Sequence, residues 1–113
     1  MPDSSPLPEA MLEVAESDGR RRMVPITENP FQIGRGAEMG NHLQLADTRI
    51  SRTSAAVIYA DGGFLLKDRG QRHGIKVNGE EVQDQRQLRD GDIIILGTAD
   101  GMQVTFRDRK SVV

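Results

Sequence analysis

The chain has 113 residues, of which 36% are hydrophobic and 28% charged, a composition typical of one globular domain. A chain of this length is too short for a large catalytic scaffold. It contains no cysteine and only two histidines, which excludes disulfides and thiolate zinc sites and argues against a metal or cofactor site. No apolar run approaches the roughly 18 residues of a membrane-spanning helix, so we expect no membrane contact, no signal peptide and a cytoplasmic, reducing environment.

The net charge of −2 is unevenly distributed along the chain. Residues 33–76 carry seven basic and four acidic side chains, whereas the rest of the chain carries eight basic and thirteen acidic ones. An acidic chain with a basic centre is poorly suited to duplex nucleic acid, which requires many phosphate contacts over a broad surface. It is suited to holding one compact anion locally, so no nucleic-acid partner is expected.

The N-terminal part predicts a disordered segment and then a hairpin. Residues 1–8 contain three prolines and two serines, which is typical of a disordered lead-in. Residues 9–16 include helix formers, but Ala10, Leu12 and Val14 alternate in the manner of a strand. Asp18-Gly19 then supplies a turn. We therefore expect residues 9–16 to form a hairpin with residues 23–26.

The rest of the chain reads as short strands separated by turns. Apolar or alternating segments cover residues 55–59, 64–67, 75–77, 81–82 and 92–96, and Met102, Val104 and Phe106 alternate. Asp-Gly or Asn-Gly pairs at residues 61–62, 78–79, 90–91 and 100–101 are typical of hairpin turns. Residues 83–89 are polar and could hold a helical turn. The sequence predicts an all-β, antiparallel β-sandwich domain over residues 9–108. Residues 109–113 would be a tail or the start of a linker to further domains.

Three polar clusters between these strands carry chemistry. In Ile33-Gly34-Arg35-Gly36, an arginine flanked by glycines projects from a strand end, and its planar fork matches a phosphate or a carboxylate. Residues 49–54 bring two arginines and three hydroxyls together before a strand, and residues 68–74 form another basic loop. Each cluster taken alone is also compatible with a solvated loop whose side chains bond locally to the backbone.

The order of five motifs along the chain gives information that the single clusters do not. They are Ile33-Gly34-Arg35, Asp47-Thr48-Arg49-Ile50-Ser51-Arg52, Leu66-Lys67-Asp68, Val77-Asn78-Gly79, and Leu88-Arg89-Asp90-Gly91-Asp92 with Ile95-Leu96-Gly97. In order and spacing they resemble the forkhead-associated (FHA) domain family, over about residues 10–107. The resemblance implies a sandwich of about eleven strands that binds phosphothreonine peptides through loops at one apex.

The resemblance also implies roles for single residues. Arg35 matches the family arginine that grips the phosphate, and Ser51 matches the serine whose hydroxyl and loop amides complete the phosphate cradle. Arg52 occupies a position that contacts the peptide backbone or the phosphate. A phosphothreonine carries roughly −1.5 to −2 charges and three acceptor oxygens at neutral pH, which suits these groups.

Four positions depart from the family pattern. Ser54 stands where the family has a histidine that braces the binding loop, so we expect the departure to affect the rigidity of that loop. The later family motif Ser-x-Asn-Gly-Thr reads Gln71-Arg72-His73-Gly74-Ile75 here. Arg72 could add a phosphate contact, and His73 could make one of the hydrogen bonds of the family asparagine. The candidate site is therefore Arg35, Ser51, Arg52, Arg72 and His73.

Three functions follow from these residues. The favoured one is a phosphothreonine-peptide recognition module for protein–protein interaction in signalling, because the phosphate-gripping residues Arg35, Ser51 and Arg52 are all present. The alternative is a degenerate FHA domain that binds proteins or neighbouring domains without phosphate, as the four departures suggest. An enzyme that uses Ser51 with His42 or His73 is disfavoured, because no nucleophile-elbow pattern is present. We therefore expect no catalytic residue.

Overall fold

The computed structural model describes residues 8–16, 19–36, 40–46, 50–71, 74–97 and 103–108. One sheet consists of β1 (Ala10–Ala15), β2 (Arg21–Pro25), β7 (Ile75–Val77), β8 (Glu80–Glu81), β10 (Ile93–Leu96) and β11 (Gln103–Asp108). The other consists of β3 (Phe31–Arg35), β4 (Leu43–Leu45), β5 (Ala55–Ala60), β6 (Gly63–Asp68) and β9 (Gln85–Gln87). Several predicted features lie outside the described residues: the lead-in over residues 1–8 (except its last residue), the tail over residues 109–113, Asp18, Asp47-Thr48-Arg49, Asp100-Gly101, Met102, Arg72 and His73.

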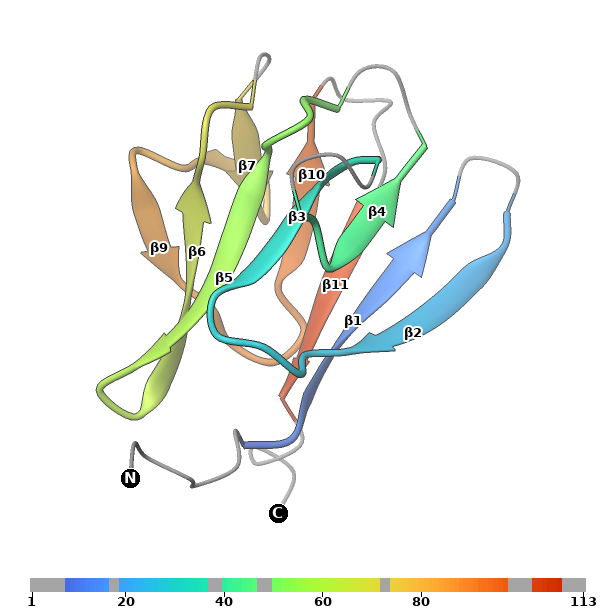
Figure 1. The fold of residues 1–113 in the computed structure, drawn as a ribbon. Coiled ribbons are helices and arrows are strands. Elements are labelled where there is room, and N and C mark those ends of the chain that lie inside the picture. The colour runs from blue at the N-terminus through green and yellow to red at the C-terminus, as the bar shows by residue number, and fades with distance from the viewer. Residues whose placement is uncertain are drawn as a thin grey trace.

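The two sheets confirm the predicted all-β sandwich (Figure 1). The strand order is β2-β1-β11-β10-β7-β8 in the six-stranded sheet and β4-β3-β5-β6-β9 in the five-stranded sheet. The pairs are antiparallel except for β3 and β4, which run parallel with Ile33 opposite Leu43. The described part of the chain has no helix long and apolar enough to cross a membrane.

Two of the predicted Asp-Gly and Asn-Gly turns close hairpins, whereas Asp90-Gly91 lies between β9 and β10, which belong to different sheets, so it closes none. β1 and β2 form the expected hairpin, with Met11 opposite Pro25. Asp61-Gly62 joins β5 to β6 and Asn78-Gly79 joins β7 to β8, and all four residues have positive φ, as two-residue hairpin turns require.

The helical turn considered for residues 83–89 does not form. Residues 85–87 instead make strand β9, which pairs with the edge of β6 through Leu65 opposite Gln87. The segment is polar because β9 is an edge strand with largely exposed side chains, so it shows no apolar alternation that would identify it.

The hydrophobic core lies between the two sheets. Alternate residues of β1, β10 and β11 face alternate residues of β3, β5 and β6, as the period of two in a strand requires. The largest fully buried side chains include Phe31, Phe106, Leu12, Ile33, Leu66 and Leu96. Each such side chain contributes roughly 1.5–3 kcal/mol relative to exposure. This core fixes the strand ends from which the connecting loops project.

Strand register gathers several strand ends at one end of the sandwich. Arg35 lies opposite Leu45 and Ala55 lies opposite Asp68, so the ends of β3, β4 and β6 and the start of β5 lie together, at the upper end in Figure 1. The other sheet joins this end through a backbone hydrogen bond of 3.2 Å from Gly97 N to Gly74 O. The first residue of β1 and the last of β11, Ala10 and Asp108, are paired at the opposite end.

Candidate functional site

The loop formed by residues 50–54, called here the 50–54 loop, is tied closely to the sandwich. Ile50 is only 1% exposed and belongs to the core, so the loop is anchored by burial. Two backbone hydrogen bonds extend the pairing with β3, from Arg35 N to Ser51 O at 3.1 Å and from Ser54 N to Ile33 O at 3.0 Å. The loop therefore has a defined backbone conformation directly beside Arg35.

Arg35 is the last residue of β3 and is half-buried. Its Nε donates to Ile50 O at 3.0 Å, which uses one of the five guanidinium N–H groups and holds the side chain against the 50–54 loop. Ser51 is half-buried and Arg52 is exposed on the same loop. The structure thus places Arg35 directly beside the loop that carries Ser51 and Arg52.

Asn41, which sequence reasoning missed, holds the 50–54 loop against the end of β3, and Gly34 allows the loop to approach closely. Asn41 is 6% exposed, and its Nδ2 donates to Gly36 O at 3.0 Å and to Arg52 O at 2.8 Å. Gly34 lies so close to the loop that a Cβ there would stand 2.1 Å from Arg52 O. The only sequence signal for Asn41 is a polar residue placed between a turn glycine and an alternating strand.

The loop is also held by Gln71, which is 6% exposed. Its Oε1 accepts hydrogen bonds from Ser51 N at 3.1 Å and from Ser54 Oγ at 2.7 Å. Ser54 is completely buried. Because it donates to Gln71, the position that lacks the family histidine still makes a polar contact with the neighbouring loop. The Ser51 amide, which belongs to the loop whose amides are expected to complete the phosphate cradle, therefore donates to Gln71.

The 69–74 connection is organised by Asp68. Its Oδ1 accepts from Gly70 N at 2.8 Å and from Gln71 N at 3.1 Å, as in an Asx turn. Ile75, the fourth departure from the family pattern, is fully buried in the core and opens β7. This departure therefore affects packing between the sheets rather than the polar surface of the loops.

Basic side chains surround the described part of this end. Arg52 and Arg69 are exposed, while Arg35 and Lys67 are half-buried. The Asp68 carboxylate is engaged with backbone amides. The resulting field favours an anion at the surface of the 50–54 loop.

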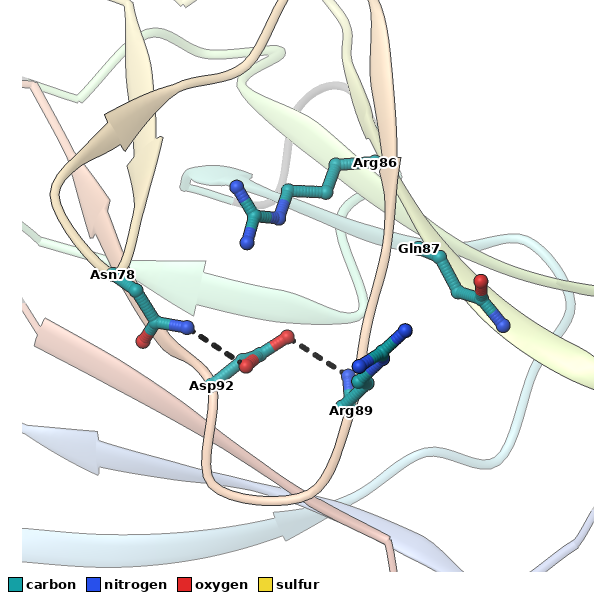
Figure 2. A pocket seen from close by; sticks show the side chains of 5 residues that line it. All are labelled: Asn78, Arg86, Gln87, Arg89 and Asp92. Atoms are coloured by element: carbon teal, nitrogen blue, oxygen red, sulfur yellow. Dashed lines mark hydrogen bonds between the residues drawn. The ribbon is translucent and has the colours of Figure 1, made fainter.

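A pocket of about 420 Å³ lies away from this site, at the other end of β7 and β10 (Figure 2). It is lined by Asn78, Arg86, Gln87, Arg89 and Asp92. The Asp92 carboxylate accepts from Asn78 Nδ2 at 2.9 Å and from Arg89 N at 2.8 Å. Asn78 thus acts as a turn residue with a structural side chain. Among the described residues, no group of three or more His, Asp or Glu side chains could hold a metal ion.

Comparisons with known proteins agree with this architecture. The model of the FHA domain family matches residues 31–97, which is more than half of the chain. A structure from a study of phosphothreonine-dependent FHA domain interactions is 29% identical, with a TM-score of 0.72 over 88% of this chain and 95% of that one. The FhaA FHA domain, complexed with the intracellular domain of Rv3910, is 30% identical, with a TM-score of 0.70 over 87% of this chain and 99% of that one.

A third similar structure belongs to a larger protein. Mycobacterium tuberculosis EmbR in complex with a low-affinity phosphopeptide is 25% identical, with a TM-score of 0.72 over 89% of this chain and 24% of that one. A comparison with curated proteins finds no significant match. The family-model match, the sandwich topology and the motif order together establish that the chain belongs to the FHA domain family.

Proposed function

We propose that this domain recognises phosphothreonine in partner proteins and serves as an interaction module in signalling. The observation that carries the proposal is the convergence of Arg35, Ser51 and Arg52 on one braced loop edge. A guanidinium, a hydroxyl and a second cation offer the charge-assisted hydrogen bonds that a phosphate with three acceptor oxygens requires. The phosphopeptide and phosphothreonine-dependent interactions of the similar FHA structures support the same ligand.

We include Arg72 and His73 in the proposed site because they follow Gln71 directly in the chain. Gln71 is fixed against the 50–54 loop, which makes the residues that follow it in the sequence candidates for the same site. A second arginine would add positive charge toward the phosphate. The imidazole of His73 would make a single hydrogen bond to the peptide backbone, where the family asparagine both donates and accepts.

An interaction role fits the site better than catalysis. His42, which a hydrolase would need beside Ser51, has another partner: its Nδ1 accepts from Gln32 N at 2.9 Å, and its ring stacks on Phe31. That geometry holds the ring at the side of β3 as a structural group. A chain without cysteine is compatible with a reducing compartment, and we propose that the domain meets its partners in the cytoplasm.

Titration with three matched peptide pools tests the proposal. The pools contain phosphothreonine, phosphoserine or unphosphorylated threonine at one fixed position. We expect phosphothreonine-selective binding in the micromolar range, about −8 kcal/mol. Arg35→Ala should weaken it about 10- to 100-fold, the effect of losing charged hydrogen bonds worth roughly 1.5–3 kcal/mol. Arg35→Lys should recover part of the lost affinity, because it restores the positive charge but not the bidentate hydrogen bonding of a guanidinium.

The matched control is Arg89→Ala, which removes an exposed arginine at the distant pocket and should leave binding unchanged. Thermal unfolding of each variant separates a binding defect from a folding defect. Equal or absent binding to all three pools by the parent domain would refute the proposal. That result would favour a phosphate-independent interaction domain.

A further inference from the structure

We propose that Gln71 and Ser54 are positioning residues that set the conformation of the 50–54 loop. The contact among Gln71, Ser51 and Ser54 is called here the Gln71 clasp. The inference rests on the proposed function for its effect on ligand binding. The geometry of the clasp itself can be tested on the free domain.

One oxygen atom forms both bonds of the clasp. Gln71 Oε1 accepts from the amide of Ser51 and from the hydroxyl of Ser54, so a single side chain grips the 50–54 loop at two points. Gln71 and Ser54 are buried, so water cannot readily replace a bond that is lost. The clasp joins two segments separated by 20 residues in sequence.

Gln71 is itself held in place from behind. Asp68 Oδ1 accepts from Gln71 N, and Gln71 O accepts from Gly74 N at 3.1 Å. Gly74 O in turn accepts from Gly97 N, which follows β10 in the other sheet. The Oε1 atom is therefore presented by a backbone that both sheets fix, and its position determines where Ser51 lies.

The clasp turns the Ser51 amide toward the protein. A phosphate at this loop then cannot use that amide, and the side chains available to it are the Arg35 guanidinium, the Ser51 hydroxyl and Arg52. Their relative placement depends on the backbone of residue 51, which Gln71 holds on one side and the Arg35 amide on the other. Small displacements of this backbone therefore reduce affinity even though Gln71 does not contact the ligand.

Gln71 and Ser54 are also linked by how this sequence differs from the family pattern. Positions 54 and 71 both depart from the FHA pattern, and the structure shows that the two residues contact each other directly at 2.7 Å. A pair of departures in mutual contact is expected when one side chain compensates for the other. The four departures thus do not all weaken the site, because two of them rebuild a brace between the same two loops.

Amide hydrogen exchange and peptide titration of the domain test the clasp. In Gln71→Ala, the Ser51 amide should exchange at least about tenfold faster, because it loses its acceptor. The apparent Kd for the phosphothreonine pool should rise about tenfold. Ser54→Ala should have a smaller effect, since the bond to the Ser51 amide remains. In Ser54→Ala/Gln71→Ala, binding should be no weaker than in Gln71→Ala alone, which indicates one shared unit.

Gln85→Ala, an exposed glutamine on the edge strand β9, is the matched control and should change neither readout. Unchanged Ser51 exchange in Gln71→Ala would overturn the clasp. Unchanged pool affinity, with the parent domain binding normally, would overturn its role in ligand recognition. If the parent binds no pool, the proposed function fails, and Ser51 exchange alone then decides whether the clasp fixes the loop. If Gln71→Ala does not fold, the same two readouts are taken on Gln71→Leu, which keeps the side-chain volume but lacks the acceptor and should give the same changes.

Discussion

Replacing Gly34 by alanine should destabilise the domain by about 2–4 kcal/mol. The new Cβ would stand 2.1 Å from Arg52 O and 2.7 Å from Asn41 Nδ2, well inside contact distance. Either the 50–54 loop or β3 must move by about 1 Å, which breaks the bond of 2.8 Å between Asn41 Nδ2 and Arg52 O. Overpacking costs roughly 1–3 kcal/mol, and a buried hydrogen bond adds about 1 kcal/mol. For a domain of this size the melting temperature should fall by about 10–20 °C.

Urea unfolding followed by circular dichroism measures this change, and Gly36→Ala is the matched control. Gly36 has a φ of +79°, but a Cβ there would meet nothing within 4 Å. Its replacement costs only the backbone strain of an alanine with positive φ, roughly 1–2 kcal/mol. The two glycines flank the same arginine, and only the alanine at position 34 would meet the loop, so steric overlap must cost more than the strain at Gly36. A Gly34→Ala loss no larger than that of Gly36→Ala would refute the close approach of loop and strand.

Two further predictions concern parts of the sandwich away from the site. Asp92→Ala should lower the free energy of unfolding, measured in urea, by about 2–3 kcal/mol, because Asn78 Nδ2 and Arg89 N both lose their buried acceptor. A loss below about 0.5 kcal/mol would show that these bonds contribute little. The hydrogen bond from Arg107 lowers the pKa of Glu13, so the ionised carboxylate stabilises the fold above the ordinary glutamate pKa. The advantage of the parent over Glu13→Gln in urea midpoint should therefore be present at pH 7 and disappear as the pH falls through the lowered pKa; a difference that persists in acid would contradict this origin.

The strands and turns could be predicted from sequence because their signals are local. Alternation identifies β1, and a pair of residues such as Asn78-Gly79 both ends one strand and begins the next. Arg35 could be proposed as a site residue only through the order of the motifs that resembles the FHA family, because the four-residue pattern around it is also typical of a solvated turn. The bracing residues Asn41 and Gln71 could not, because each acts on atoms 11 or 20 residues away. Their burial follows from how loops meet after folding, which no local pattern encodes.

The pairing of Ala10 with Asp108 brings the chain into the domain and out of it at neighbouring points. Both points lie at the end opposite the 50–54 loop. An attachment at either side therefore leaves the loop end unobstructed, and the whole domain can be inserted into a surface loop of another protein with little separation between the two junctions. Immobilised through either junction on a sensor surface or joined in tandem, copies of the domain should all keep their loops facing outward.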